Sequence, residues 1–296
     1  MLTPEELKQI RRISLQAGRR VDSLFAGGYR SAFKGQGMEF EEVRLYTPGD
    51  DVRHIDWNVT ARARVPHIKE YREERELTIL LAIDVSGSMG FGQPSKRLQM
   101  ARVAGGLAYA AIRASDRVGL LAFSDHVEQY VPPRKSRGHA WRVIREAFEF
   151  AGRETARPRG LRGFFARPAR PRTDVAAAAD HLGKVLKRRS EVVLISDFLS
   201  PGDWTGPVRA LAARHRVHAL LLHDPLEEGG VVAGLAEVAD AETGELRLID
   251  LSTLGPRRRL AVRLDELRRA GCRATAISTD QDPFIVLRQH FERHAS

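Results

Sequence analysis

Small oxygen-bearing side chains follow two strongly apolar runs of this 296-residue chain. Asp84, Ser86 and Ser88 end the first run, Asp197 follows the second, and Thr173 stands where a helix is expected to begin. Alternate residues of a turn can point to one side, so Asp84, Ser86 and Ser88 can converge. Hydroxyl and carboxylate oxygens without imidazole or thiolate suit a hard divalent cation. We therefore expect the five residues to bind Mg²⁺ or Mn²⁺, with water or a partner's oxygen completing the set of ligands.

Each of these residues also has an ordinary structural interpretation. Ser86 or Ser88 could cap the next helix, and Thr173 could cap the helix that follows it. Asp174 most simply places a negative charge at a helix start, where the helix dipole favours it. A capping role for Thr173 is compatible with metal binding.

The elements that must position these residues alternate between short apolar strands and helices. The patterns predict strands at 77–85, 117–123, 127–131, 191–196, 217–222 and 274–278, a hairpin within 236–250, and helices at 95–114, 139–151, 174–189, 204–214, 257–270 and 283–294. This alternation predicts an α/β fold with a mostly parallel, doubly wound sheet covered on both faces. Ligands of such sheets bind beyond the carboxyl ends of the strands, where Asp84 and Asp197 stand.

The pattern of apolar and polar residues along the chain changes at about residue 77. Residues 77–296 carry the α/β pattern, whereas 1–76 form a separate N-terminal region that we expect to pack on the main domain. A capping box and Pro4 predict a helix at 4–17. The polar stretch 38–76 has no comparable pattern. Its aspartates suggest turns and ion pairs with nearby arginines, namely Asp50, Asp51 and Asp56 with Arg44, Arg53 or Arg62.

The positive charge is concentrated in one segment. The chain has 48 Lys and Arg against 38 Asp and Glu, a net charge of +10, and residues 134–172 contribute nine of these charges. A solvated loop is the simplest interpretation. A docking surface for an acidic partner or a nucleic acid is the functional one. The arginines closest to Thr173 are the candidates for that surface: Arg153, Arg157, Arg159, Arg162, Arg167, Arg170 and Arg172.

Several classes of protein and site are disfavoured by composition. No apolar run approaches the roughly 20 residues of a membrane helix, and the charged first residues do not resemble a signal peptide. A single cysteine, Cys272, excludes an internal disulfide and suggests a buried thiol. The histidines show no spacing typical of a zinc site. We expect a cytoplasmic protein.

The arrangement Asp84-x-Ser86-x-Ser88 after an apolar strand, with Thr173 and Asp197 later, resembles the metal-ion-dependent adhesion site of von Willebrand factor type A domains. The resemblance implies that the serines and the threonine approach the metal, while the aspartates act through water. It also implies that a glutamate or aspartate of a partner completes the shell. Where that family usually has glycine after the last aspartate, this chain has Phe198, which leaves the conformation of that loop open.

The segment 37–57, together with Ala61-Arg62 and residues 71–74, resembles bacterial proteins of domain-of-unknown-function family 58. Members of that family are often encoded beside MoxR-type AAA+ ATPases. The resemblance therefore implies a partner or adaptor of such an ATPase.

These observations favour a binding module over an enzyme. The leading hypothesis is a divalent-metal-dependent protein-binding module that engages a partner's carboxylate. The alternative is a nucleic-acid-binding protein that uses the segment 134–172. A metal-dependent hydrolase is less favoured, because Ser86 stands where an Asp-x-Asp phosphatase needs a second carboxylate, and neither a phosphate-binding glycine loop nor a Gly-x-Ser-x-Gly motif is present.

Overall fold

The computed structural model describes residues 39–72, 77–152, 172–228, 235–239, 246–250 and 258–294. Contacts divide the chain into a small unit within 34–76 and a larger unit that includes all described residues from Leu77 onward. The predicted helix at 4–17 lies outside the described residues. The packing of the N-terminal region on the main domain stays a prediction.

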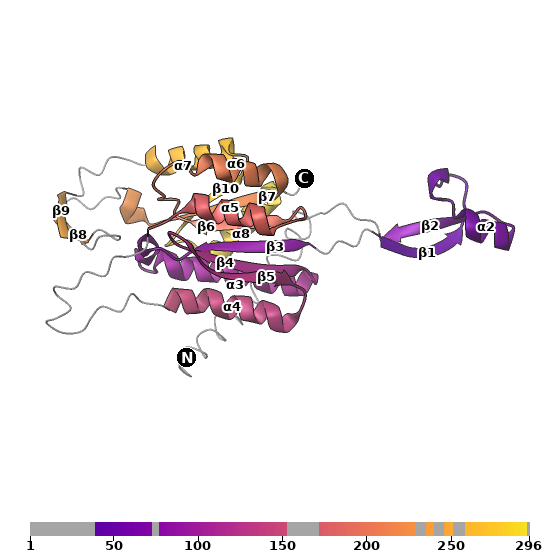
Figure 1. The fold of residues 1–296 in the computed structure, drawn as a ribbon, viewed down its shortest axis with the longest axis horizontal. Coiled ribbons are helices and arrows are strands. Elements are labelled where there is room, and N and C mark those ends of the chain that lie inside the picture. The colour runs from indigo at the N-terminus through magenta and orange to yellow at the C-terminus, as the bar shows by residue number, and fades with distance from the viewer. Residues whose placement is uncertain are drawn as a thin grey trace. The chain divides into compact units, whose positions relative to one another are not determined.

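The larger unit is built on a six-stranded sheet (Figure 1). Five strands are parallel and one edge strand is antiparallel. In spatial order they are β10 (Arg273–Ser278), β7 (Arg216–His223), β6 (Glu191–Ser196), β3 (Thr78–Asp84), β4 (Arg117–Phe123) and the antiparallel β5 (Val127–Arg134). The α/β fold with a doubly wound, mostly parallel sheet is therefore confirmed.

Helices cover both faces of this sheet (Figure 1). Side chains of β3 alternate between two buried cores, with Leu81 and Ile83 in one and Leu80 and Ala82 in the other. The first core packs against α3 (Lys96–Ala114), α4 (Arg137–Gly152) and α8 (Pro283–Arg293). The second packs against α5 (Val175–Val185), α6 (Thr205–Arg214) and α7 (Arg258–Arg269).

The strand order reverses between β3 and β6. The chain runs outward from β3 to β4 and β5, then returns to place β6 on the other side of β3. Asp84 ends β3 and Asp197 directly follows β6, and the register pairs Ile83 with Ile195 just before them. Both aspartates therefore lie at the switch point, where sheets of this type bind ligands.

Most predicted elements are present, with boundaries shifted by a few residues. The hairpin within 236–250 consists of β8 (Leu235–Ala239) and β9 (Leu246–Asp250). Helix α5 ends at Val185, four residues short of the predicted end, and Leu186 after it is extended. Cys272 is buried, and burial raises the pKa of its thiol to about 12.

Two glycines of α3, Gly105 and Gly106, let neighbouring helices approach closely. A Cβ on Gly105 would lie 3.1 Å from Phe148 of α4, and one on Gly106 would lie 2.4 Å from Phe284 of α8.

The small unit is an antiparallel pair of strands with two short helical turns. The strands are β1 (Glu39–Leu45) and β2 (His67–Arg72), joined through η1 (Val52–His54) and α2 (Trp57–Ala63). Sequence patterning did not predict these strands, because 38–76 mixes charged and apolar residues without a clear alternation.

The aspartates of the small unit have structural roles. Asp50 binds Arg44 through two hydrogen bonds of 2.8 and 2.9 Å, and Asp51 pairs with Arg53. Asp56 caps α2 and pairs with Lys69 rather than with an arginine. Hydrogen bonds from Arg44 and Thr47 hold the pKa of Asp50 well below its usual value.

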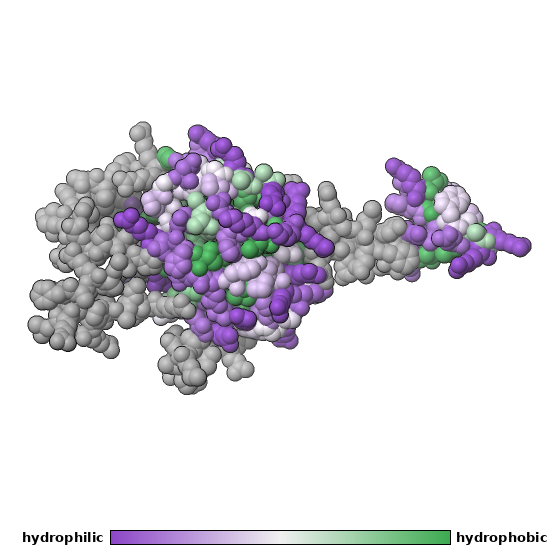
Figure 2. All heavy atoms as spheres, viewed as in Figure 1, coloured by the Kyte–Doolittle hydropathy of each residue, from purple (hydrophilic) through white to green (hydrophobic). Residues whose placement is uncertain are grey.

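Polar and charged side chains cover most of the visible described surface, and apolar side chains form smaller patches between them (Figure 2). None of the helices in the described part of the chain is long and apolar enough to cross a membrane.

Candidate metal-binding site

The loop after β3 is fixed by backbone contacts. The Val85 N–H donates to the Phe123 carbonyl at 2.8 Å, which extends the β3–β4 ladder by one residue. The Ser86 N–H then turns back and donates to Asp84 Oδ1 at 2.9 Å. From α3, Arg97 Nη2 donates to the Ser86 carbonyl at 2.8 Å. These bonds set the direction in which the Ser86 and Ser88 side chains leave the loop.

Three hydroxyl groups meet beside this loop. Thr173 Oγ1 donates to Ser86 Oγ at 2.8 Å, and Ser86 Oγ lies 3.2 Å from Ser88 Oγ. All three residues are buried. The threonine comes from a segment 87 positions away, which is held by a bond from the Asp174 N–H to the Ser124 carbonyl and another from Ser200 Oγ to the Thr173 carbonyl.

The capping alternatives for these hydroxyls are wrong. Asp174 caps α5 by accepting from the Ala177 N–H, as expected for a charge at a helix start. Ser95 caps α3 by accepting from the Leu98 N–H. The side chain of Ser86 makes no cap bond to the turn that follows it, η2 (Gly87–Gly90).

Asp84 is fully buried at the end of β3. Its Oδ2 accepts a hydrogen bond of 2.5 Å from Ser196, a residue that the sequence analysis did not single out. Burial, with a smaller contribution from the charge of Asp197, raises the pKa of Asp84 to about 7. The site thus holds a carboxylate whose negative charge is poorly compensated, and a bound cation would stabilise that charge.

Asp197 is also fully buried, and both of its oxygens have partners. Oδ1 accepts from the Leu199 N–H at 3.1 Å, and Oδ2 lies 2.7 Å from the ammonium of Lys96. Lys96 has a second ion pair of 2.6 Å with Glu227. Burial alone would lower the pKa of Lys96, but the charges of Asp197 and Glu227 outweigh burial and raise it.

Sequence reasoning missed Lys96, although a signal was present. Lys96 and Arg97 occupy the first turn of a helix, where the helix dipole disfavours positive charge. Two cations there imply anionic or carbonyl partners nearby, and the structure shows them at Asp197 and Ser86.

The residues present suit a hard divalent cation. Three neutral hydroxyl oxygens meet beside the carboxylate of Asp84, and Asp197 is close enough to raise the pKa of Asp84. Hydroxyl and carboxylate oxygens without imidazole or thiolate are the ligands that Mg²⁺ and Mn²⁺ prefer. Across the described ranges, no group of three or more His, Cys, Asp or Glu side chains is arranged to hold a metal ion. Binding here would therefore depend on the hydroxyls of Ser86, Ser88 and Thr173.

The loop after β6 has a backbone conformation that suits glycine. Phe198 has a φ of 53°, in the left-handed region that few residues other than glycine adopt. The Phe198 N–H donates to Ser196 Oγ at 2.8 Å, and its ring packs 5.8 Å from that of Trp204. The ring packing and this bond stabilise a conformation that Phe would otherwise disfavour.

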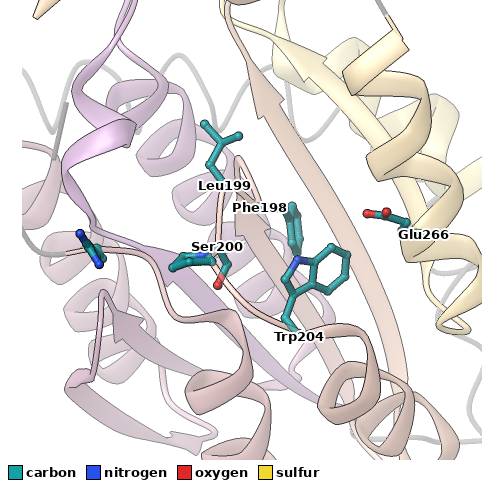
Figure 3. A pocket seen from close by; sticks show the side chains of 7 residues that line it. Phe198, Leu199, Ser200, Trp204 and Glu266 are labelled. Carbon is teal, nitrogen blue, oxygen red and sulfur yellow. The ribbon is translucent and has the colours of Figure 1, made fainter. Parts of the chain in front are cut away.

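A pocket of about 600 Å³ adjoins this loop (Figure 3). Glu266 of α7 points toward the Phe198 and Trp204 rings, while Leu199 points away from them. The full lining is Arg172, Phe198, Leu199, Ser200, Pro201, Trp204 and Glu266. Arg172 is exposed and directly precedes Thr173. The other six candidate arginines (Arg153, Arg157, Arg159, Arg162, Arg167 and Arg170) lie outside the described residues.

Residues 42–269 match the family described as "Protein of unknown function DUF58". The chain belongs to the DUF58 family. This DUF58 protein is 34% identical over 246 residues to uncharacterized proteins of Mycobacterium tuberculosis (Rv1480) and Mycobacterium bovis (Mb1516), covering 82% of its own chain and 73% of theirs.

Its larger unit has an α/β fold with a mostly parallel, doubly wound sheet. Among solved structures, BatB from Bacteroides thetaiotaomicron matches with a TM-score of 0.47 and 15% identity, over 74% of this chain and 98% of that one. A von Willebrand factor type A protein from Catenulispora acidiphila matches with a TM-score of 0.40 and 13% identity, over 77% and 43%. Matches this distant carry no information on function.

Proposed function

We propose that this DUF58 protein is a protein-binding module that depends on a divalent cation, Mg²⁺ or Mn²⁺. Ser86, Ser88 and Thr173 would bind the ion directly, and Asp84 and Asp197 would act through water. The observation that carries the proposal is the meeting of three buried hydroxyls, from segments 87 residues apart, beside a buried carboxylate.

The ligand count leaves room for a partner. Mg²⁺ takes about six oxygens in an octahedron and usually keeps several waters. Three hydroxyls leave positions open, and a glutamate or aspartate of a partner protein could occupy one of them. The neutral hydroxyls contribute no negative charge, so a carboxylate from outside would also balance the charge of the ion.

The surroundings of the site offer a partner an apolar surface with one charge of each sign. The loop 197–201 both forms the site and lines the pocket, and Ser200 links the two through its bond to the Thr173 carbonyl. Arg172 and Glu266 place opposite charges in the lining, and Leu199 is 45% exposed. From the family resemblance, a MoxR-type AAA+ ATPase is the first partner to test.

The hydroxyl chemistry supports binding rather than catalysis. A serine or threonine nucleophile needs an adjacent base. In the described part of the chain, the hydroxyls of Ser86, Ser88 and Thr173 hydrogen-bond to one another and not to a histidine.

The proposal is tested by calorimetric titration of Mn²⁺ into the full chain, with and without acetate as a model carboxylate. We expect one site, weakened at least about tenfold by Thr173→Val, because the methyl group replaces a ligand oxygen. Ser190→Ala is the matched control, since Ser190 is a buried serine whose hydroxyl binds the Arg188 carbonyl at the opposite end of β6.

Two results would contradict the proposal. One is a folded wild type that binds no Mn²⁺ even with acetate. The other is Mn²⁺ binding that Thr173→Val leaves unchanged. A metal-independent, strongly salt-dependent affinity for nucleic acid would instead support the alternative that uses the segment 134–172.

A further inference from the structure

Lys96 is fully buried, and its ammonium lies between two carboxylates. It is 2.7 Å from Asp197 Oδ2 and 2.6 Å from Glu227 Oε1. A buried charge is stable only when it is paired. Lys96, Asp197 and Glu227, which we call the charge trio, therefore form one electrostatic unit at the edge of the candidate metal site.

The charge trio is held in place from three elements. Glu227 belongs to the short turn η4 (Pro225–Glu228) after β7, and its Oε2 accepts from the Asp224 N–H at 3.2 Å. Asp224 Oδ2 in turn accepts from Thr279 Oγ1, just beyond β10, at 2.6 Å. Since α3 supplies Lys96 and residue 197 follows β6, the positions of the three charges are set by the fold and not by flexible surface side chains.

The pairing limits what Asp197 can offer to a cation. One of its oxygens is taken by Lys96 and the other by the Leu199 N–H. The ammonium also repels a divalent ion and offsets the charge of Asp197. The hydrogen bonds to Asp84 come from Ser86 and Ser196, and neither donor is a cation. Asp84 therefore differs from Asp197, which is paired with Lys96.

We propose that the buried ammonium of Lys96 makes firm metal binding depend on a carboxylate supplied by the partner. The inference rests on the proposed function and deepens it. Beside the ion, Lys96 offsets the charge of Asp197, so that of the two carboxylates of the site only Asp84 presents an uncompensated charge until an external carboxylate joins it. Lys96 is thus a positioning and charge-setting residue, and it makes the metal and the acidic partner bind cooperatively.

Four versions of the full chain test this at pH 8 and constant ionic strength: the wild type, Lys96→Met, Glu227→Gln and the double variant. Counting one charge per group, the charge trio carries −1 in the wild type, −2 in Lys96→Met, 0 in Glu227→Gln and −1 in the double variant. Mn²⁺ is titrated calorimetrically into each, with and without acetate, and circular dichroism checks folding.

Without acetate, we expect Lys96→Met to bind Mn²⁺ at least about tenfold more tightly than the wild type, and Glu227→Gln to bind it more weakly. The double variant should return close to the wild type. Acetate should tighten Mn²⁺ binding strongly in the wild type and much less in Lys96→Met, because the extra charge is then already present.

A merely structural ion pair gives a different result. Lys96→Met would then lower stability without tightening Mn²⁺ binding, and that outcome overturns the inference alone. If Lys96→Met does not fold, Glu227→Gln decides, since Glu227 is 22% exposed and its loss leaves the Lys96–Asp197 pair intact. Unchanged Mn²⁺ affinity in Glu227→Gln overturns the inference. Failure of every folded version to bind Mn²⁺, even with acetate, overturns the proposed function together with it.

Discussion

Asp84 belongs to the candidate site, and its burial makes the stability of the protein depend on pH. It has no exposed surface, and burial raises its pKa from 3.8 to about 7. In the folded protein the Asp84 carboxyl therefore stays protonated up to about pH 7, whereas in the unfolded chain it loses its proton near pH 4. Because the folded state then binds more protons, this group lowers the free energy of unfolding as the pH rises from about 4 to 7.

We expect Asp84→Asn to stabilise the metal-free protein and to abolish metal binding. The amide oxygen can accept the Ser86 N–H, and the amide NH₂ can donate to the Ser196 hydroxyl. The gain in the free energy of unfolding should be about 1–3 kcal/mol at pH 8 and smaller at pH 5. Urea unfolding with a chelator at both pH values measures it. A gain that does not depend on pH would contradict this explanation.

Helix α3 connects the candidate site to the core. Its first turn places Lys96 on Asp197 and Arg97 on the Ser86 carbonyl, and its middle packs closely against two other helices. Gly106 allows the approach of Phe284 from α8, where a Cβ would lie 2.4 Å from a ring carbon. The helix is therefore constrained along its length by contacts that its own sequence pattern does not reveal.

Gly106→Ala should lower the free energy of unfolding by about 1–3 kcal/mol, because overpacking against Phe284 outweighs the gain in helix propensity. The matched control is Gly183→Ala in α5, where a Cβ would meet no atom within 4 Å. That variant should be neutral or more stable by up to about 1 kcal/mol. Equal effects of the two substitutions in urea unfolding would show that Phe284 moves aside without cost.

Across the whole larger unit, a second buried polar cluster lies toward the amino-terminal ends of the strands, away from the candidate site. His218 Nδ1 of β7 and His290 Nε2 of α8 are 2.8 Å apart, and His290 Nδ1 lies 2.6 Å from Thr275 Oγ1 of β10. His218 Nε2 is 3.3 Å from Glu191 of β6. These contacts join three strands and the last helix.

Burial, followed by neighbouring positive groups, lowers the pKa of His218 to about 3 and that of His290 to about 2. Below pH 6.5 these histidines bind protons in the unfolded chain but stay neutral in the folded protein. They therefore lower the free energy of unfolding as the pH falls below 6.5. Glu191, whose pKa burial raises to about 7, acts in the opposite sense between about pH 4.5 and 7.

His290→Gln isolates the contribution of one histidine. At pH 8 we expect the variant to be less stable than the wild type, because packing is lost. Between pH 6.5 and 4.5 we expect its free energy of unfolding to fall less steeply with acidification than that of the wild type, by about 1.4 kcal/mol per pH unit. Parallel pH profiles of wild type and His290→Gln in urea unfolding would contradict the assignment.

The sequence by itself determined the α/β class and most strand and helix positions, and it singled out Ser86, Ser88 and Thr173, whose hydroxyls meet at the carboxyl edge of the sheet. It could do so because alternating apolar strands and helices are local patterns, and because parallel strands bring their carboxyl ends to one edge. Metal binding by these residues stays a prediction. The strands of the small unit were missed for lack of such a pattern.

The tertiary structure alone decided which charges accompany the site. Lys96 reaches Asp197 and Glu227, which lie 101 and 131 positions away, and Ser196 reaches Asp84 from 112 positions away. The histidine pair spans 72 positions. No local spacing encodes such pairs, because they depend on strand order and on how α3 and α8 pack against the sheet. Those features arise from the packing of the whole core, in which burial forces each polar group to find a partner.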